Sequence, residues 1–130
     1  MSFEKQIEQS RTVITKAVFP NTTNHYDTLY GGQALDWMDE VAFITATRFS
    51  RQRMVTVSSD QVSFKKPIPS GTIIELVGKV THVGTSSLKV SVEMHMENMY
   101  DTDRTLAVKG AFSFVAIDEN KKPEKLKINP

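Results

Sequence analysis

The sequence predicts an α+β protein in which an antiparallel β-sheet wraps around one long central α-helix. Apolar residues repeat at three- and four-residue steps over residues 31–48, as on an amphipathic helix. Four later segments are rich in Val, Ile, Thr, Phe and Met, with turn residues between them. A strand, a long helix and then a run of strands is an α+β order. With 130 residues and no internal repeat, we expect a single domain over 1–130.

The predicted elements follow one another with clear boundaries. Residues 11–19 alternate and are rich in β-branched side chains, which predicts a first strand that ends at Pro20. A polar loop over 21–30 leads to the helix, which at the standard rise is about 27 Å long and can cross several strands. Further strands are predicted at 54–64, 73–83, 87–96 and 105–117.

Short connections with turn residues join the later strands, which favours antiparallel neighbours. Edge strands left open in such a sheet favour the pairing of two copies into a two-fold dimer. After the last strand, residues 118–130 are rich in Lys and Glu, and we expect a mobile tail there.

Composition argues against several kinds of protein. The formal net charge is +1, and no segment approaches the roughly 20 apolar residues of a membrane span. The chain has no cysteine, and His25, His82 and His95 lack metal-ligand spacing, so we expect no metal site. The tail lysines have no aromatic or Arg-rich neighbours, so we expect no nucleic-acid binding. The charged first residues do not resemble an export signal, and we expect a cytoplasmic protein.

The start of the long helix is the best candidate for a catalytic site. Gly31 and Gly32 let a ligand approach backbone N–H groups that have no partner inside the helix. Asn24 precedes this pair, and Asp39 follows it by two turns at the margin of the apolar face. An amide, N–H donors and a carboxylate together suit an attack on a carbonyl group.

Other residues compete for these roles. Asp36 and Glu40 are rival bases on the same helix, and His25 is a rival catalytic group because imidazole titrates near neutral pH. Asn24 has the alternative role of capping a turn, which is the commonest use of asparagine in loops.

Several short motifs, in their order and spacing, resemble those of the hotdog-fold acyl-CoA thioesterases, in the branch with the brain-type and related bacterial acyl-CoA hydrolases. The motifs are Pro20-x-x-x-Asn24, Gly31-Gly32, Met38-Asp39-Glu40, Val55-Thr56-Val57, Phe64-x-x-Pro67-Ile68-x-x-Gly71 and Gly84-Thr85-Ser86-Ser87. They cover nearly the whole predicted core, and together they are specific although each is weak alone. The resemblance implies a hotdog fold and an enzyme that hydrolyses fatty acyl-CoA to free fatty acid and coenzyme A. It implies no metal or redox cofactor.

The resemblance also implies the roles of individual residues. Asn24 would position the thioester or the water, the Gly32 N–H would polarise the thioester oxygen, and Asp39 would be the general base or the nucleophile. In the family, one subunit supplies the asparagine and the N–H while its partner supplies the acid, so a homodimer is the minimal unit. We expect a hexamer, as a trimer of dimers, with a tetramer as the alternative.

Substrate binding is implied for residues around these groups. Gly31 and His25 would contact the substrate, and the turn Gly84-Thr85-Ser86-Ser87 would lie by the phosphates of coenzyme A, where small residues and free N–H groups suit an anion. Where related sequences often carry glycine, this chain has Asp27, which makes the loop bulkier. We expect this change to alter acyl selectivity.

Two other functions fit the same fold. A hotdog dehydratase acting on acyl thioesters would need a paired histidine and acid at the helix, and only His25 is near, on the other side of the glycines. A non-catalytic acyl-CoA binding or regulatory module needs neither Asn24 nor Asp39. The presence of both residues favours turnover.

Overall fold

The computed structural model describes residues 2–128, and the predicted long helix and all five predicted strands form in it. Its elements are α1 (Ser2–Ser10), β1 (Thr12–Ala17), η1 (Pro20–Thr22), α2 (Gly31–Ser50), β2 (Arg53–Phe64), β3 (Thr72–Val83), β4 (Ser87–Asn98) and β5 (Arg104–Ile117). Among these residues no helix combines the length and hydropathy needed to cross a bilayer.

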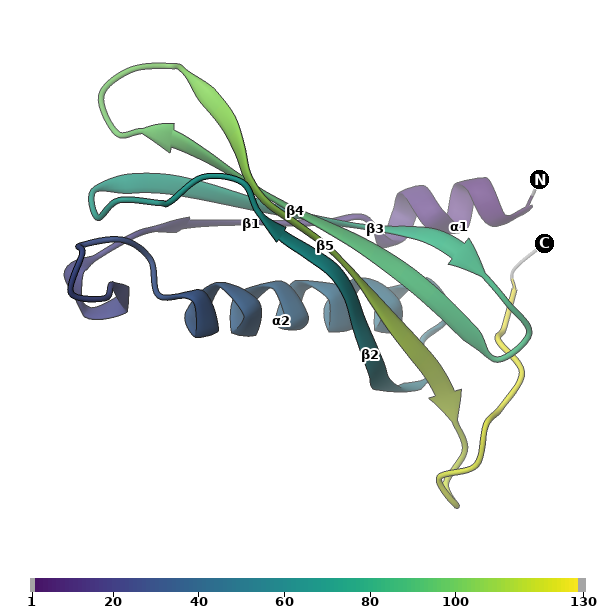
Figure 1. Cartoon of the computed structure of the whole chain (residues 1–130). Coiled ribbons are helices and arrows are strands. Elements are labelled where there is room, and N and C mark those ends of the chain that lie inside the picture. The colour runs from purple at the N-terminus through teal and green to yellow at the C-terminus, as the bar shows by residue number, and fades with distance from the viewer. Residues whose placement is uncertain (1, 129–130) are drawn as a thin grey trace.

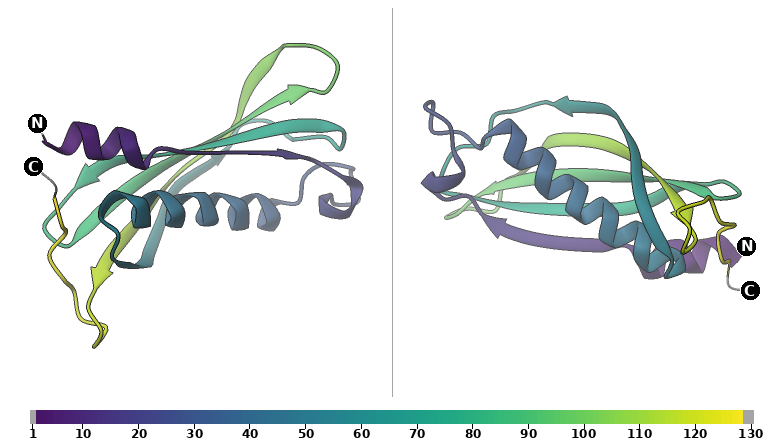
Figure 2. Two further views of the ribbon diagram at one scale, coloured as in Figure 1. Left: turned by 180° about the vertical axis from the view of Figure 1, so that it is seen from behind. Right: turned by 90° about the horizontal axis from the view of Figure 1, so that it is seen from below.

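The strands form one antiparallel sheet in the order β1-β3-β4-β5-β2, so β1 and β2 lie at its edges (Figure 1). The sheet curves over α2, which crosses one of its faces (Figure 2). The predicted α+β class, with an antiparallel sheet around one long helix, is therefore confirmed.

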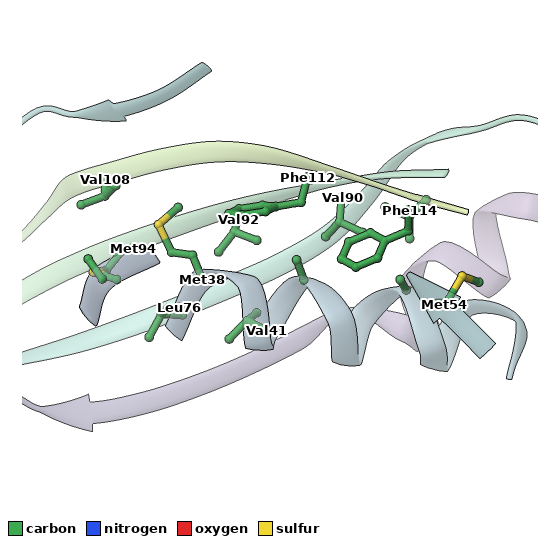
Figure 3. Packing of buried hydrophobic residues seen from close by; sticks show 14 of the residues in the cluster. Met38, Val41, Met54, Leu76, Val90, Val92, Met94, Val108, Phe112 and Phe114 are labelled. Atoms are coloured by element: carbon green, nitrogen blue, oxygen red, sulfur yellow. The ribbon is translucent and has the colours of Figure 1, made fainter. Parts of the chain in front are cut away.

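The core lies between α2 and the concave face of the sheet. Met38 and Val41 point from the helix toward strand residues such as Val92 and Phe114, and all four are buried (Figure 3). Burying each side chain of this size stabilises the fold by about 1.5–3 kcal/mol. This packing fixes the helix on the sheet and thereby positions the residues on its flanks.

A glycine in β3 lets α2 approach the sheet closely. Gly78 is buried beneath the helix, and a Cβ atom there would lie 2.5 Å from Thr45 Oγ1 and 2.9 Å from Val41 Cγ1. The Thr45 hydroxyl donates to the Val41 carbonyl at 2.8 Å, so its oxygen is held within the helix. A side chain at position 78 would have to displace these helix atoms.

The N-terminal helix α1 was not predicted from the sequence. It contacts the C-terminal half of α2 through a polar residue, because the buried Gln6 side chain donates to the Phe49 carbonyl and, at 2.9 Å, to the Lys127 carbonyl. The helix has few apolar residues, and a polar contact of this kind leaves no trace in hydrophobic periodicity.

The segment after β5, for which the sequence predicts a mobile tail, packs against the rest of the chain as far as residue 128; residues 129 and 130 lie outside the described residues. Leu126 is buried, and its N–H donates to the Thr85 carbonyl at 2.8 Å. The buried Gln52 amide donates to the Lys125 carbonyl at 3.0 Å and accepts from the Lys127 N–H at 3.0 Å. Two glutamines, Gln6 and Gln52, thus hold this segment at the end of α2.

Strand β2 forms an open edge of the sheet. Most of its side chains are exposed, including Val55, Val57 and Phe64, and its pairing with β5 shifts register twice. On the adjacent helix Leu35 and Phe43 are also exposed. An apolar edge of this kind is a surface that natural proteins cover.

Candidate active site

Helix α2 begins without a side-chain cap. Tyr30 is the N-cap residue, and the Ala34 N–H donates to its carbonyl at 3.0 Å. The N–H groups of Gly31 and Gly32 precede this first bond, so they have no intrahelical acceptor and lie at the positive end of the helix dipole. The Tyr30 ring lies against Gly32, where a Cβ atom would be 2.8 Å from Tyr30 Cε2. A larger residue at position 32 would push this ring aside.

An open groove of about 380 Å³ runs along the first turns of α2. It is lined by Gly32, Leu35, Asp36, Asp39, Thr56, Ser59 and Phe112. The four helix residues follow three- and four-residue steps, which places them on one face of the helix. Two predicted site residues, Gly32 and Asp39, therefore line one groove with the rival Asp36, whereas Glu40 is not among its lining residues.

Thr56 is a site residue that sequence reasoning missed. It projects from β2 into the groove, and its hydroxyl donates to Asp39 Oδ1 at 3.2 Å. The motif Val55-Thr56-Val57 contributes its spacing to the family resemblance, which by itself gives Thr56 no role. The available signal was the alternation of the strand, which places Thr56 on the same face of the sheet as the buried Met54 and therefore toward the helix.

The carboxylate and the helix start are well separated within one chain. Asp39 follows Gly32 by seven positions along α2, which corresponds to roughly 10 Å between their Cα atoms at the standard helical rise. An N–H donor and a base acting on one thioester need to be within a few ångströms of the same carbon. The separation of the two Cα positions along the helix is larger than this reach.

Asn24 caps the loop that precedes the helix. Its Oδ1 accepts the Tyr26 N–H at 2.9 Å, the Thr28 N–H at 3.3 Å and the Thr28 hydroxyl at 3.1 Å. Its backbone N–H donates to the Thr28 carbonyl at 2.8 Å. The turn-capping role is thus present, and it occupies the amide oxygen while the Nδ2 group is not part of the turn.

The same loop explains one departure from the family pattern. Asp27 has φ 61°, in the left-handed region that favours glycine. Aspartate is among the residues that tolerate this region, so the loop keeps its shape. His25 is exposed and its ring contacts that of Tyr26, with centroids 3.9 Å apart. His25 is not among the residues that line the groove.

The turn between β3 and β4 lies at the other end of the molecule from Gly31 and Gly32, beside the C-terminal segment (Figure 1, Figure 2). The Gly84 N–H donates to the Ser87 carbonyl at 2.7 Å, and the Ser86 carbonyl accepts the Ala116 N–H at 2.9 Å. The Thr85 carbonyl is bound by the segment after β5. One chain therefore does not bring this turn to the groove.

A family model described as the thioesterase superfamily matches residues 26–102, which include the helix start, the groove residues of α2 and the β3–β4 turn. An uncharacterized acyl-CoA thioester hydrolase of Bacillus subtilis is 41% identical over 116 residues, which cover 89% of this chain and 67% of that protein. The chain belongs to the thioesterase superfamily. It spans about two thirds of the length of this relative.

Solved structures of acyl-CoA thioesterases have the same fold as this member of the family. A hexameric acyl-CoA thioesterase solved in its apo form superposes with a TM-score of 0.90 and 39% identity, over 94% of this chain and 78% of that chain. The acyl-CoA hydrolase of Staphylococcus aureus, solved with butyryl coenzyme A and coenzyme A, superposes with a TM-score of 0.89 and 35% identity, over 94% and 74%. The predicted hotdog fold is confirmed.

Three positions that were substituted in the Staphylococcus aureus enzyme have the same residue types and the same spacing as three residues of this chain. An asparagine, an aspartate and a threonine of that enzyme have each been replaced by alanine, and these positions are separated by 15 and 17 residues. Asn24, Asp39 and Thr56 have the same order and the same separations. The groove threonine thus stands in the same pattern as the two residues predicted from the sequence.

Proposed function

We propose that this protein hydrolyses the thioester of fatty acyl-CoA to a free fatty acid and coenzyme A. The observation that carries the proposal is Asp39, a carboxylate that accepts a hydrogen bond from Thr56 in an open groove, which is also lined by Gly32. The relatives named as acyl-CoA hydrolases support the same substrate class.

In the proposed reaction Asp39 acts as general base on a water molecule, which attacks the thioester carbon. The carbonyl oxygen becomes an oxyanion stabilised by the Gly32 N–H and the Asn24 amide. The intermediate then collapses, the carbon–sulfur bond breaks, and the coenzyme A thiolate leaves and takes up the proton from Asp39. The alternative is direct attack by the carboxylate to form an anhydride, which water then hydrolyses. Neither route requires a metal or redox cofactor, because a thioester is already electrophilic.

We propose that two subunits build each site. Gly32 and Asp39 of one chain are roughly 10 Å apart along the helix, so one thioester is better served by Gly32 of one subunit and the partner subunit's Asp39. The exposed apolar edge of β2 is the surface that a second copy would cover. Hexameric relatives support a trimer of such dimers, with a tetramer as the alternative.

The coenzyme A phosphates are assigned to the turn from Gly84 to Ser87, which is distant from the helix start of its own chain. Small residues and hydroxyl groups at this turn suit an anion. The rat relative named as cytosolic, 27% identical, supports a cytoplasmic location.

The first test is release of free thiol from a panel of acyl-CoAs, with wild type beside Asp39→Ala. Loss of general-base catalysis predicts a fall in kcat of roughly 10²–10⁴ while the variant still binds acyl-CoA. Binding by the wild type without turnover of any acyl-CoA would overturn the hydrolase and leave a binding module.

A subunit-mixing experiment tests the shared site. Asn24→Ala and Asp39→Ala are each expected to be inactive alone. In a mixed dimer, one of the two sites contains an intact Asn24 from one subunit and an intact Asp39 from the other. Unfolding and refolding the two variants together should therefore restore about a quarter of wild-type activity, because about half of the dimers formed are mixed. A mixture that stays inactive, although it forms mixed dimers, would show that each site lies within one chain.

A further inference from the structure

We infer that Thr28 is a positioning residue of the active site, which orients the Asn24 amide so that only its NH₂ group faces the substrate. This inference rests on the proposed function, because Asn24 acts on substrate only if the site is an active site.

The orientation of the Asn24 amide is fixed by the donors around it. Asparagine oxygen and nitrogen atoms are alike in shape and are distinguished by their hydrogen-bond partners. Two of the partners here are backbone N–H groups, of Tyr26 and Thr28, which can only donate. The atom that faces them must be the oxygen, so Nδ2 points away from the turn.

The Thr28 hydroxyl donates the third hydrogen bond to the Asn24 side chain. Among residues 2–128, it is the only side-chain group that forms a hydrogen bond with this amide. It donates to Oδ1 at 3.1 Å, while the Thr28 N–H donates to the same atom at 3.3 Å. A carboxamide with two lone pairs on oxygen is saturated by these donors. Asn24 is therefore left with donors only, and no acceptor for Nδ2 is found among the described residues.

This geometry decides between the two roles considered for Asn24. A group that only donates suits the thioester oxygen, which gains negative charge during attack, because donors aimed at a developing charge stabilise the transition state. A group that is to hold water for attack would better accept a proton from it. The structure thus favours Asn24 as a hydrogen-bond donor to the thioester oxygen, with Thr28 fixing the orientation of its amide.

The position of Thr28 is itself fixed by partial burial and by backbone contacts. It is half-buried, its carbonyl accepts the Asn24 N–H at 2.8 Å, and it forms a bridge with Pro69 in the loop after β2. The next residue, Leu29, is buried and donates to the Ile68 carbonyl at 2.6 Å. The loop after β2 therefore fixes the positions of Thr28 and its neighbour through contacts with Pro69 and Ile68, and Thr28 in turn fixes the orientation of the Asn24 amide.

The test compares Thr28→Val, which removes the hydroxyl and keeps the shape, with Thr28→Ser, which keeps the hydroxyl. The matched control is Thr23→Val, which removes a hydroxyl bond to the Pro20 carbonyl in the same loop without touching Asn24. Loss of one orienting hydrogen bond predicts a fall in kcat of about five- to tenfold for Thr28→Val, with KM nearly unchanged. Thr28→Ser and Thr23→Val should keep wild-type kcat within about twofold.

A double variant separates positioning from a direct or purely structural role. With Asn24→Ala in place, Thr28→Val should cause no further loss of kcat, because the hydroxyl acts only through the amide. An equal loss with and without Asn24, a Thr28→Ser variant as impaired as Thr28→Val, or a Thr28→Val variant with wild-type kcat would each overturn the inference while hydrolysis by the wild type stands. A wild type and a Thr23→Val variant that hydrolyse no acyl-CoA would instead overturn the proposed function, and the inference with it.

Discussion

The hydroxyl of Thr56 lies 3.2 Å from Oδ1 of Asp39, so a side chain of the edge strand β2 holds the carboxylate of helix α2 in the groove. A hydroxyl that donates to one carboxylate oxygen restricts the rotation of the carboxylate. The proposed base is therefore positioned by the strand that forms the open edge of the sheet.

Removing this hydroxyl tests its contribution. Thr56→Val should lower kcat by about five- to tenfold, because the carboxylate loses one orienting hydrogen bond, and Thr56→Ser should retain most of the activity. Steady-state kinetics with a saturating acyl-CoA measure both. Equal activity of the valine and wild-type proteins would mean that the 3.2 Å contact does not serve the reaction.

Asn24→Asp separates the capping role of Asn24 from its role as a donor. A carboxylate oxygen can accept the same loop N–H groups, so the variant should keep its free energy of unfolding within about 0.5 kcal/mol of wild type. It has no NH₂ group to offer the substrate, and its charge opposes an oxyanion. We expect kcat to fall by roughly 10²-fold or more, as for loss of an oxyanion donor. Thermal unfolding and thiol release on one preparation give both values, and an active Asn24→Asp variant would contradict the donor role.

The two glycines at the helix start should differ in tolerance to alanine. A Cβ atom at Gly31 meets nothing within 4 Å, whereas one at Gly32 lies 2.8 Å from Tyr30 Cε2. Gly31→Ala should leave folding unchanged or stabilise it by up to about 1 kcal/mol. Gly32→Ala should displace the Tyr30 ring and lower kcat/KM. Recovery of kcat/KM in Gly32→Ala combined with Tyr30→Ala would identify the ring as the cause, and no recovery would point to the helix start itself.

The C-terminal segment should contribute to stability. Gln52→Ala removes hydrogen bonds to Glu124, Lys125 and Lys127 and leaves part-buried backbone groups of the last two residues without this partner. We expect the free energy of unfolding to fall by about 2–4 kcal/mol. Gln9→Ala, an exposed glutamine in α1, is the control and should change it by no more than about 0.5 kcal/mol. Urea unfolding at one fixed protein concentration measures both, and equal values would show that the segment is held by other contacts.

Periodicity predicted the elements that bury an apolar face, and it could not find those that are held by polar contacts. Helix α2 and the five strands carry regular apolar patterns, and their ends lie close to the predicted ones. Helix α1 and the segment after β5 are held in part by the side-chain amides of Gln6 and Gln52, whose partners are more than 40 residues away in sequence. No local pattern reports such pairs.

The candidate site shows the same division. Gly32 and Asp39 follow from helix geometry, which the sequence determines locally. The contact of Thr56 with Asp39 depends on how β2 crosses the helix, and the orientation of the Asn24 amide depends on a turn that only coordinates reveal. The distance of the turn at Gly84 from the helix start is also a property of the sheet and not of any segment.

Gly78 lets α2 lie close to the sheet, and it is not among the residues that line the groove. Because α2 rests against this residue, with hypothetical Cβ contacts of 2.5 and 2.9 Å, the height of the helix above the sheet is set by the absence of one methyl group. Lifting the helix at that point would move its whole flank, including Leu35 and Asp39, away from Phe112. Position 78 is thus a site where evolution or design could retune the fit for acyl chains of different bulk while leaving every wall residue unchanged.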